Sequence, residues 1–264
     1  MINPEAVLSD MQALSIAAGK EILKMYKKSV PIEYKNDDTP VTAADKAANE
    51  IIVNGLKERY PTIPILAEES TDNLLRLRER FCFLVDPLDG TKEFIKENDE
   101  FTVNIALTEL GRPIGGVINV PVYEELYFGW KGMGSYSLIN NKREKLKVSN
   151  RIQNIRLAKS RSYQDERLDK LIRINRDVIG EIIIAGSAYK GCLLAKGEVE
   201  AYYRYGRTME WDTAAMEIIV SEAGGVLSGI DGKLLVYNKK NPENPTGFYL
   251  LNDKENALLL PKEL

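Results

Sequence analysis

The sequence contains no histidine among its 264 residues. This absence excludes a Ser-His-Asp triad, a histidine general base, a zinc–histidine site and a phosphohistidine intermediate. Any hydrolytic chemistry must therefore depend on carboxylates, hydroxyls, lysine or a metal ion.

Cysteine is almost as scarce, with only Cys82 and Cys192. Both lie in apolar or helical surroundings, so we expect two buried thiols rather than a disulfide. No segment approaches the roughly eighteen apolar residues of a membrane-spanning helix, and the N-terminal region lacks the pattern of a signal peptide. We expect a cytoplasmic protein without a transmembrane segment, and peripheral association with the inner membrane is left open.

The chain also lacks an excess of one charge, because 36 basic and 39 acidic residues give a net charge of −3. This balance argues against a nucleic-acid binder and against a polybasic membrane adaptor. The length and an apolar content of 44% are sufficient for a substantial core. Apolar strands within residues 113–130 permit a homodimer as well as a monomer.

Hydrophobic periodicity predicts a mixture of helices and strands. In the first half we expect helices at 4–28, 42–60 and within 72–80, a polar loop at 36–40, and strands at 30–35, 63–67, 81–85, 101–110, 113–120 and 124–130. In the second half we expect strands at 155–159, 181–185, 199–205 and 225–227, alternating with helices at 165–174, 188–196 and 212–223. The pattern predicts an α+β unit, residues 1–150, joined to an α/β unit, residues 151–264, with helices sandwiched among sheets.

The most informative motif is DPLDGT at residues 86–91, directly after the apolar run FCFLV. It places the carboxylates of Asp86 and Asp89 and the carbonyl of Leu88 at the end of a buried strand, where α/β proteins bind ligands. Oxygen ligands suit Mg²⁺, and the amides of Gly90 and Thr91 at the start of a helical turn suit a phosphate. An ordinary type I turn is the structural alternative. The motif makes a phosphate-hydrolysing enzyme the first hypothesis.

Three acidic sites accompany this motif, and each has a local explanation as well. Glu68 and Glu69 follow a short strand, where they are either a solvated pair or a source of one metal ligand. Asp45 fits a capping box that begins at Thr42, and Asp212 precedes an alanine-rich helix as an N-cap would. Their joint occurrence at strand ends and helix starts favours the functional interpretation.

A basic group completes the candidate site. Ser187 and Lys190 begin a helix, and Arg204 lies in the strand that follows. A lysine in a first helical turn usually reaches solvent. The functional alternative is a basic pocket wall that binds a second phosphate of the substrate.

Taken together, these motifs resemble the lithium-sensitive, Mg²⁺-dependent phosphatase superfamily that includes inositol monophosphatase and fructose-1,6-bisphosphatase. The resemblance runs to about residue 250 and is carried by DDTPVTAAD (37–45), AEES (67–70), residues 86–120, and WDTAA (211–215) ahead of EAGG (222–225). KEFI (92–95) and SAYK (187–190) are closer to the bisphosphate-nucleotidase branch than to the inositol branch. The resemblance to this superfamily implies a layered αβαβα sandwich.

The resemblance also implies roles for individual residues. The ligands of two or three Mg²⁺ ions would be Glu68, Asp86, the Leu88 carbonyl, Asp89 and Asp212. Asp45 and Thr91 would orient and deprotonate the attacking water. The substrate would contact Glu68, Asp89, Gly90, Thr91, Ser187, Lys190, Arg204 and Asp212. Relatives commonly carry histidine at the position of Tyr163, so a substrate contact made there by imidazole would be altered.

The reaction that the resemblance implies is hydrolysis of adenosine 3′,5′-bisphosphate to AMP and phosphate by direct attack of water, without a phosphoenzyme. 3′-Phosphoadenylyl sulfate is a second candidate substrate. Hydrolysis of inositol or sugar phosphates at the same site is the main alternative. An aspartyl-phosphate hydrolase is disfavoured because its D-x-D-G-T motif is one residue shorter. A non-catalytic nucleotide or metal sensor would not need Asp45 and Thr91 together.

Overall fold

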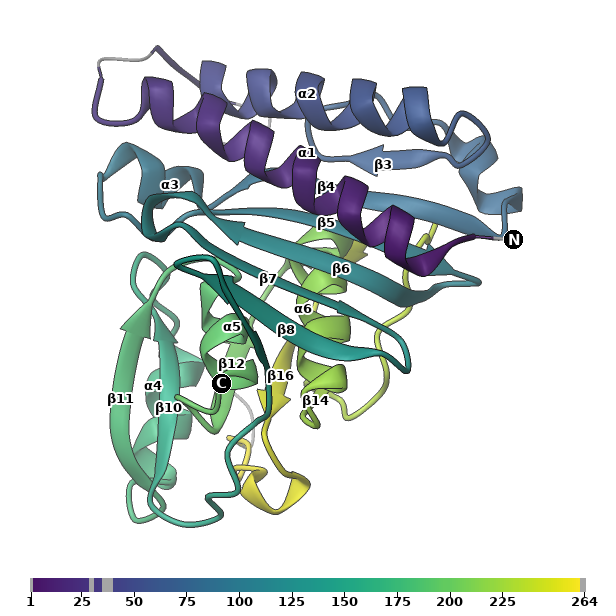
Figure 1. The fold of residues 1–264 in the computed structure, drawn as a ribbon. Coiled ribbons are helices and arrows are strands. Elements are labelled where there is room, and N and C mark those ends of the chain that lie inside the picture. The colour runs from purple at the N-terminus through teal and green to yellow at the C-terminus, as the bar shows by residue number, and fades with distance from the viewer. Residues whose placement is uncertain (1, 29–30, 35–39, 262–264) are drawn as a thin grey trace.

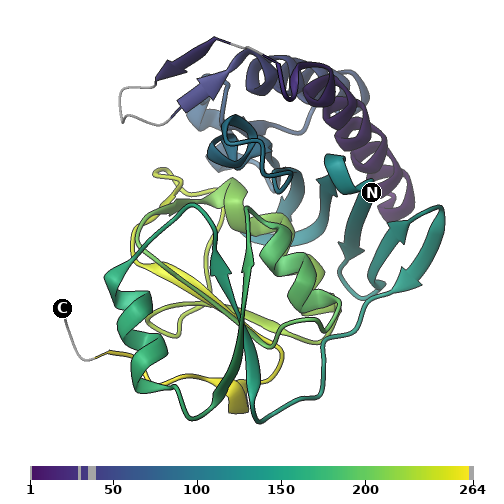
Figure 2. The same ribbon diagram turned by 90° about the vertical axis from the view of Figure 1, so that its left-hand side faces the viewer.

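The computed structural model describes residues 2–28, 31–34 and 40–261, which form alternating layers of helix and sheet (Figure 1). Helices α1 (Pro4–Met25) and α2 (Ala43–Arg59) cover the outer face of a seven-stranded sheet. Helices α5 (Tyr189–Ala195) and α6 (Glu210–Glu222) separate its inner face from a five-stranded sheet. Helix α4 (Glu166–Ile174) covers the far face of that second sheet, as the turned view in Figure 2 shows. The predicted αβαβα sandwich is confirmed.

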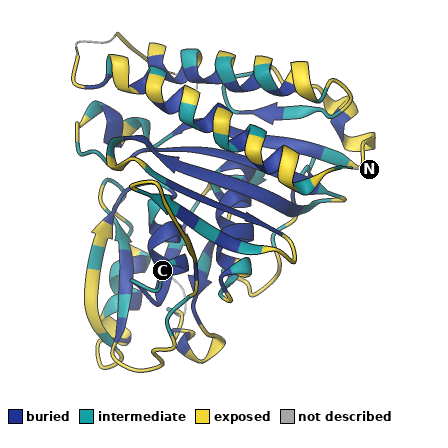
Figure 3. Cartoon of the chain, in the orientation of Figure 1, coloured by how far each residue is buried: buried dark blue, intermediate teal, exposed yellow. Residues whose placement is uncertain are grey.

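The larger sheet has the strand order β3-β4-β5-β6-β7-β8-β9. Its strands are β3 (Ile65–Ala67), β4 (Phe81–Asp89), β5 (Thr102–Glu109), β6 (Arg112–Val120), β7 (Glu125–Trp130), β8 (Gly134–Ile139) and β9 (Lys142–Lys145). β3 runs parallel to β4, and the remaining neighbours are antiparallel. Both faces of the central strands are buried, which explains why they appear in the sequence as continuous apolar runs (Figure 3). The strands predicted at 101–110, 113–120 and 124–130 are present as the antiparallel neighbours β5, β6 and β7, and β8 and β9, which were not predicted, extend them.

The smaller sheet has the order β11-β10-β12-β16-β14. Its strands are β10 (Ile155–Ser160), β11 (Ile179–Ala185), β12 (Ala201–Tyr205), β14 (Val226–Gly229) and β16 (Gly247–Leu251). β10 pairs in parallel with β11 and β12, whereas β16 lies antiparallel between β12 and β14. Pattern reading did not predict β16. The minor elements are β1 (Ile32–Tyr34) with β2 (Pro40–Thr42), β13 (Thr208–Met209) with β15 (Glu243–Asn244), α3 (Thr91–Ile95), and three 3₁₀ turns, η1 (Leu74–Arg78), η2 (Pro121–Tyr123) and η3 (Lys254–Asn256).

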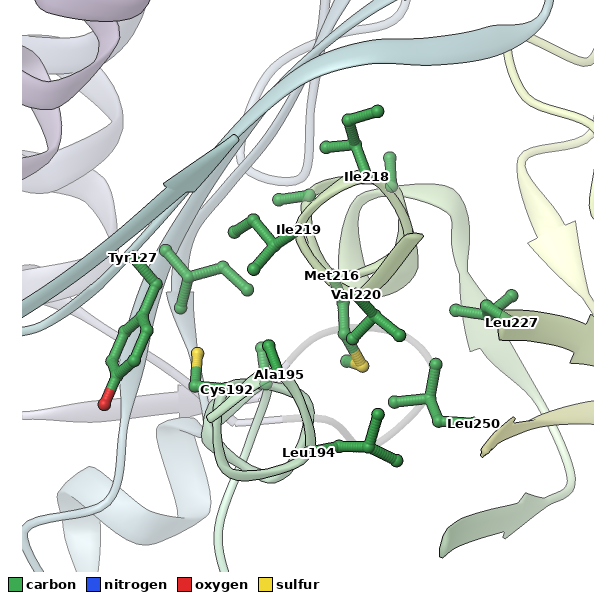
Figure 4. Close-up of a cluster of buried hydrophobic side chains, with 14 of the residues drawn as sticks. Tyr127, Cys192, Leu194, Ala195, Met216, Ile218, Ile219, Val220, Leu227 and Leu250 are labelled. Atoms are coloured by element: carbon green, nitrogen blue, oxygen red, sulfur yellow. The ribbon is translucent and has the colours of Figure 1, made fainter. Parts of the chain in front are cut away.

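Helix α6 is the centre of the core, and Figure 4 shows its apolar side chains between the two sheets. Ile219 is fully buried in the cluster that also contains Tyr127 of β7 and Leu250 of β16. Gly116 on β6 permits this close approach, because a Cβ atom there would lie 2.5 Å from Ile218 Cγ2. Cys82 and Cys192 are buried free thiols, as predicted.

The start of helix α2 agrees with the prediction, and the start of helix α6 does not. Thr42 caps α2, and Asp45 completes the expected capping box. Asp212 is not the N-cap of α6, so that interpretation was wrong: the helix begins two residues earlier, and Asp212 is its third residue. The predicted loop at 36–40 and the start of the 37–45 block fall largely at residues 35–39, outside the described residues. Within the described residues, no helix is long and apolar enough to cross a membrane.

Candidate active site

A cavity of about 260 Å³ collects the candidate residues from both halves of the chain. Residue Glu68 directly follows β3, the DPLDGT motif ends β4 and begins α3, and Asp212 lies in the first turn of α6. The predicted site residues that line the cavity are Glu68, Asp86, Leu88, Asp89, Gly90, Thr91, Ser187, Lys190, Arg204 and Asp212. Asp45 lies directly behind Thr91. The structure thus brings together residues that span more than half of the sequence.

Backbone amides hold two of the acidic side chains in place. Oδ1 of Asp86 accepts a hydrogen bond from the amide of Leu88, at 3.2 Å. Oδ2 of Asp212 accepts from the amide of Met209, at 2.8 Å. Burial and the charges of neighbouring carboxylates raise the pKa of both Asp86 and Asp212 well above its usual value. Each group is therefore a positioned, poorly solvated carboxylate.

Asp89 is held by one of its two carboxylate oxygens. Its Oδ2 accepts from the amide of Ala188 at 2.6 Å and from the side chains of Asn104 and Thr102, each at 3.3 Å. Burial raises the pKa of Asp89 to about 6, and the charge of Lys190 opposes that rise. The contact with Ala188 ties the end of β4 to the segment before α5, which belongs to the other half of the chain.

The donor set fits a hard divalent cation. Four carboxylates and the Leu88 carbonyl offer oxygen only, and a bound cation relieves the repulsion between neighbouring carboxylates. Among the described residues, no three acidic or cysteine side chains already close around one point as a preformed metal cage. The carboxylates are instead spread around the cavity wall, and their roles as ligands stay a prediction.

Thr91 and Asp45 form a hydrogen-bonded pair at the edge of the cavity. The hydroxyl of Thr91 donates to Oδ1 of Asp45 at 3.0 Å. The other carboxylate oxygen of Asp45 accepts from the amide and the hydroxyl of Thr42, at 2.7 and 2.6 Å. Burial raises the pKa of Asp45, and these hydrogen bonds oppose the rise. The capping box therefore does not exclude a functional role, because it uses only one of the two oxygens.

Gly90 gives the motif its turn. Its φ of +95° lies in the left-handed region, and a Cβ atom there would lie 3.2 Å from Cβ of Ser187. A side chain would therefore be strained and would crowd Ser187, which lies just before α5. Glycine permits the chain to pass directly from β4 into α3, with the cavity alongside.

The basic group has contacts that the sequence did not indicate. Lys190 does not reach solvent: it is only 2% exposed and donates to the carbonyl of Ser187 at 2.7 Å. Burial lowers the pKa of Lys190 to about 8, against the opposing charge of Asp89. The hydroxyl of Ser187 donates to the carbonyl of Glu100 at 2.9 Å. Both residues line the cavity, although part of their hydrogen-bonding capacity is used within the protein.

Arg204 is stacked on an aromatic ring. Its guanidinium carbon lies 3.3 Å from the ring centroid of Tyr163, and one nitrogen donates to the carbonyl of Tyr205 at 3.0 Å. Tyr163 and Arg204 both line the cavity. Tyr163 thus supports a cation that faces the site.

Sequence reasoning missed one acidic residue of this site, Glu93. It lines the cavity and is only 6% exposed. The pattern KEFI separated branches of the family by resemblance, but nothing in it indicated that this side chain faces inward. Its place in the first turn after Gly90 was the available signal.

The fold and this site are those of a phosphatase family. The model of the inositol monophosphatase family matches residues 3–261, so the chain belongs to this family. Among its relatives is the 3′(2′),5′-bisphosphate nucleotidase CysQ of Salmonella typhimurium, which is 39% identical over 253 residues, covering 92% of this chain and 98% of the relative.

Solved structures agree with this assignment. CysQ from Bacteroides thetaiotaomicron, a bacterial member of the inositol monophosphatase family, matches with a TM-score of 0.82 at 33% identity and covers 94% of this chain and 98% of its own. The IMPase of Thermotoga maritima matches with a TM-score of 0.80 at 24% identity, over 94% and 92% of the two chains. The second likeness concerns the fold alone.

Proposed function

We propose that the protein is a Mg²⁺-dependent phosphomonoesterase that hydrolyses adenosine 3′,5′-bisphosphate to AMP and phosphate. 3′-Phosphoadenylyl sulfate is a second proposed substrate. The observation that carries the proposal is the convergence of Glu68, Asp86, Asp89 and Asp212 on one cavity that Thr91 also lines, with Asp45 bonded behind it. High identity to relatives named as bisphosphate nucleotidases selects the nucleotide among phosphate esters.

Cation binding accounts for the acidic half of the cavity. We assign Glu68, Asp86, the Leu88 carbonyl, Asp89 and Asp212 as ligands of two or three Mg²⁺ ions. When bound, the metal supplies neutralisation of the phosphate charge and acidity for the attacking water. The amides of Gly90 and Thr91 hold the scissile phosphate, in keeping with the place of both residues in the cavity lining.

Thr91 and Asp45 move the proton. The Thr91 hydroxyl gives its own hydrogen to Asp45, so its lone pairs remain to accept a proton from water. Asp45 then takes the proton of Thr91, and its second oxygen stays fixed by Thr42. This relay replaces the histidine base that the chain does not have. No side chain becomes phosphorylated.

The basic wall serves the remaining part of the nucleotide. Lys190 and Arg204 place two positive charges in the lining of the cavity, and Ser187 lies in the same lining. A substrate with a second phosphate uses both halves of such a site. The cytoplasmic location and the choice between monomer and homodimer stay predictions.

Phosphate release from a panel of esters tests the proposal. The purified protein is assayed with adenosine 3′,5′-bisphosphate, 3′-phosphoadenylyl sulfate and inositol monophosphate, each with Mg²⁺ and with EDTA. We expect Mg²⁺-dependent release that is fastest from the bisphosphate. In ¹⁸O-labelled water, one labelled oxygen should enter the product phosphate. A preference for inositol monophosphate would overturn the substrate assignment, and a trapped phosphoaspartate would overturn the mechanism.

A further inference from the structure

Glu93 is a buried carboxylate in the cavity wall that the proposed chemistry does not use. It lines the cavity and is 6% exposed. Among the described residues, no donor hydrogen-bonds to its carboxylate. The two oxygens of this carboxylate are not fully buried, so they face the solvent of the cavity and can accept a hydrogen bond from a bound molecule.

Helix capping does not explain this side chain. Glu93 is the third residue of α3, where an acidic side chain commonly bonds to the amide of the N-cap residue. Asp45 in α2 and Asp212 in α6 make that bond. No equivalent bond joins Glu93 to Gly90 among the described residues, so the amide of Gly90 stays available to the substrate.

Two glycines fix the place of Glu93. A Cβ atom on Gly90 would lie 3.3 Å from Oε2 of Glu93, so the carboxylate lies beside the residue whose amide holds the scissile phosphate. A Cβ atom on Gly186 would lie 2.8 Å from Cγ of Glu93, so the stem of the side chain packs against that glycine. The acceptor therefore lies beside Gly90, the residue to which the proposed function assigns the scissile phosphate.

A carboxylate in this place does not bind the phosphate, because the two charges repel each other. It binds a donor that is attached next to the phosphate. In a ribonucleoside 3′-phosphate that donor is the hydroxyl on the neighbouring carbon. We propose that Glu93 accepts a hydrogen bond from the hydroxyl vicinal to the scissile phosphate and so selects ribonucleotides over 2′-deoxyribonucleotides. This inference rests on the proposed function and adds the group that recognises the sugar.

Neutralisation of Lys190 is the competing role for Glu93. The charge of Glu93 acts on Lys190 and on Asp89. A purely electrostatic role would affect every substrate equally. Recognition of a hydroxyl affects only substrates that carry it, so paired substrates separate the two roles.

The test compares kcat/KM for adenosine 3′,5′-bisphosphate and for its 2′-deoxy analogue. We expect the wild-type protein to prefer the ribonucleotide by about 10- to 100-fold, the size of a hydrogen bond to a charged acceptor. Glu93→Ala should lower the ribonucleotide value selectively and bring the ratio close to one. Glu93→Gln, which keeps an acceptor oxygen, should give an intermediate ratio. Glu50→Ala, at an exposed position of α2, is the matched control and should keep the wild-type ratio.

The outcomes separate the inference from the function it depends on. If Glu93→Ala lowers both values equally, or if the wild-type protein does not distinguish the two nucleotides while releasing phosphate from both, the inference is overturned and the proposed function stands. If the wild-type protein releases phosphate from neither nucleotide, both are overturned. Thermal unfolding of each variant shows whether it is folded.

Discussion

The hydroxyl of Thr91 lies 3.0 Å from Oδ1 of Asp45, although the two residues are 46 positions apart in the chain. The hydroxyl also lies 3.4 Å from the carbonyl of Leu88, so the carboxylate is its nearer acceptor. Asp45 is 2% exposed and has its other oxygen fixed by Thr42. The pair is therefore rigid and oriented before any substrate arrives.

Substitution of Thr91 or Asp45 should lower kcat strongly and change the unfolding temperature little. We expect Asp45→Asn and Thr91→Ala to lower kcat by about 10²- to 10⁴-fold, the usual contribution of a general base. Thr91→Ser keeps the hydroxyl and should retain most of the rate. Steady-state phosphate release measures the effect, and thermal unfolding measures stability. A kcat for Thr91→Ala close to the wild-type value would show that the hydroxyl takes no proton.

The carboxylates of the cavity should bind the cation jointly. Asp89→Ala should abolish the Mg²⁺-dependent rate, and Asp86→Asn should weaken Mg²⁺ binding in calorimetry. In the wild-type protein Mg²⁺ should also raise the unfolding temperature, because it neutralises buried charges of one sign. An unchanged Mg²⁺-dependent rate in Asp89→Ala would contradict the ligand assignment.

Without divalent cations, the stability should depend on pH through the same groups. The pKa of Asp89 is raised from 3.8 to about 6, chiefly by burial. A raised pKa means that the protonated group favours the folded state, so this contribution is complete below pH 3.8 and is lost as the pH rises through 6. It amounts to about 2–3 kcal/mol.

We therefore expect the unfolding temperature in EDTA to fall between pH 4 and pH 6, and to fall less in Asp89→Asn. Asp177→Asn, whose side chain is 91% exposed, is the control and should follow the wild-type curve. Identical pH profiles for the wild-type protein and Asp89→Asn would show that this carboxyl is not strained by its surroundings.

Tyr163 should act through the arginine that it supports. A stacked guanidinium gains about 0.5–2 kcal/mol from an aromatic ring. Tyr163→Ala should therefore raise KM for the bisphosphate about 2- to 30-fold with little change in kcat. Tyr163→Phe keeps the ring and should keep KM. An equal loss in Tyr163→Phe and Tyr163→Ala would assign the effect to the phenol hydroxyl instead.

Smaller side chains in the core around α6 should lower the free energy of unfolding and leave the catalytic rate of the folded protein unchanged. Ile219 is fully buried between the sheets. Ile219→Val should cost about 0.5–1.5 kcal/mol and Ile219→Ala about 2–5 kcal/mol of unfolding free energy. Denaturant titration measures both costs. The kcat of the folded fraction should stay near the wild-type value.

Much of this structure could be predicted from the sequence because local patterns determined it. Thr42 and Asp45 mark a helix start within four residues, and the apolar strands from 102 to 130, separated by short turns, are regular enough to recognise. β16 was missed because its pairing partners, β12 and β14, are distant in the chain and its own five residues carry little pattern.

In the site, too, residues marked by a local sequence pattern were predicted, and residues placed by tertiary packing were not. The residues at strand ends, such as Asp86 and Asp89, were found because charge directly after a buried strand is unusual. Glu93 was missed because glutamate in a first helical turn is common, and only the packing of Gly90 and Gly186 turns it inward. The start of α6 was misplaced because Met209, an apolar residue, takes the position where a polar cap was expected.

The position of α6 also has a consequence for how the protein is made. On the ribosome, the large sheet can pair its strands once β9 has emerged, but the helix that covers its inner face ends only at Glu222. For more than sixty residues of further synthesis, the part of that nascent sheet that α6 covers stays exposed. Premature termination in this interval would leave a fragment with an exposed apolar surface. Chaperones and proteases should therefore bind truncated products more than the finished chain.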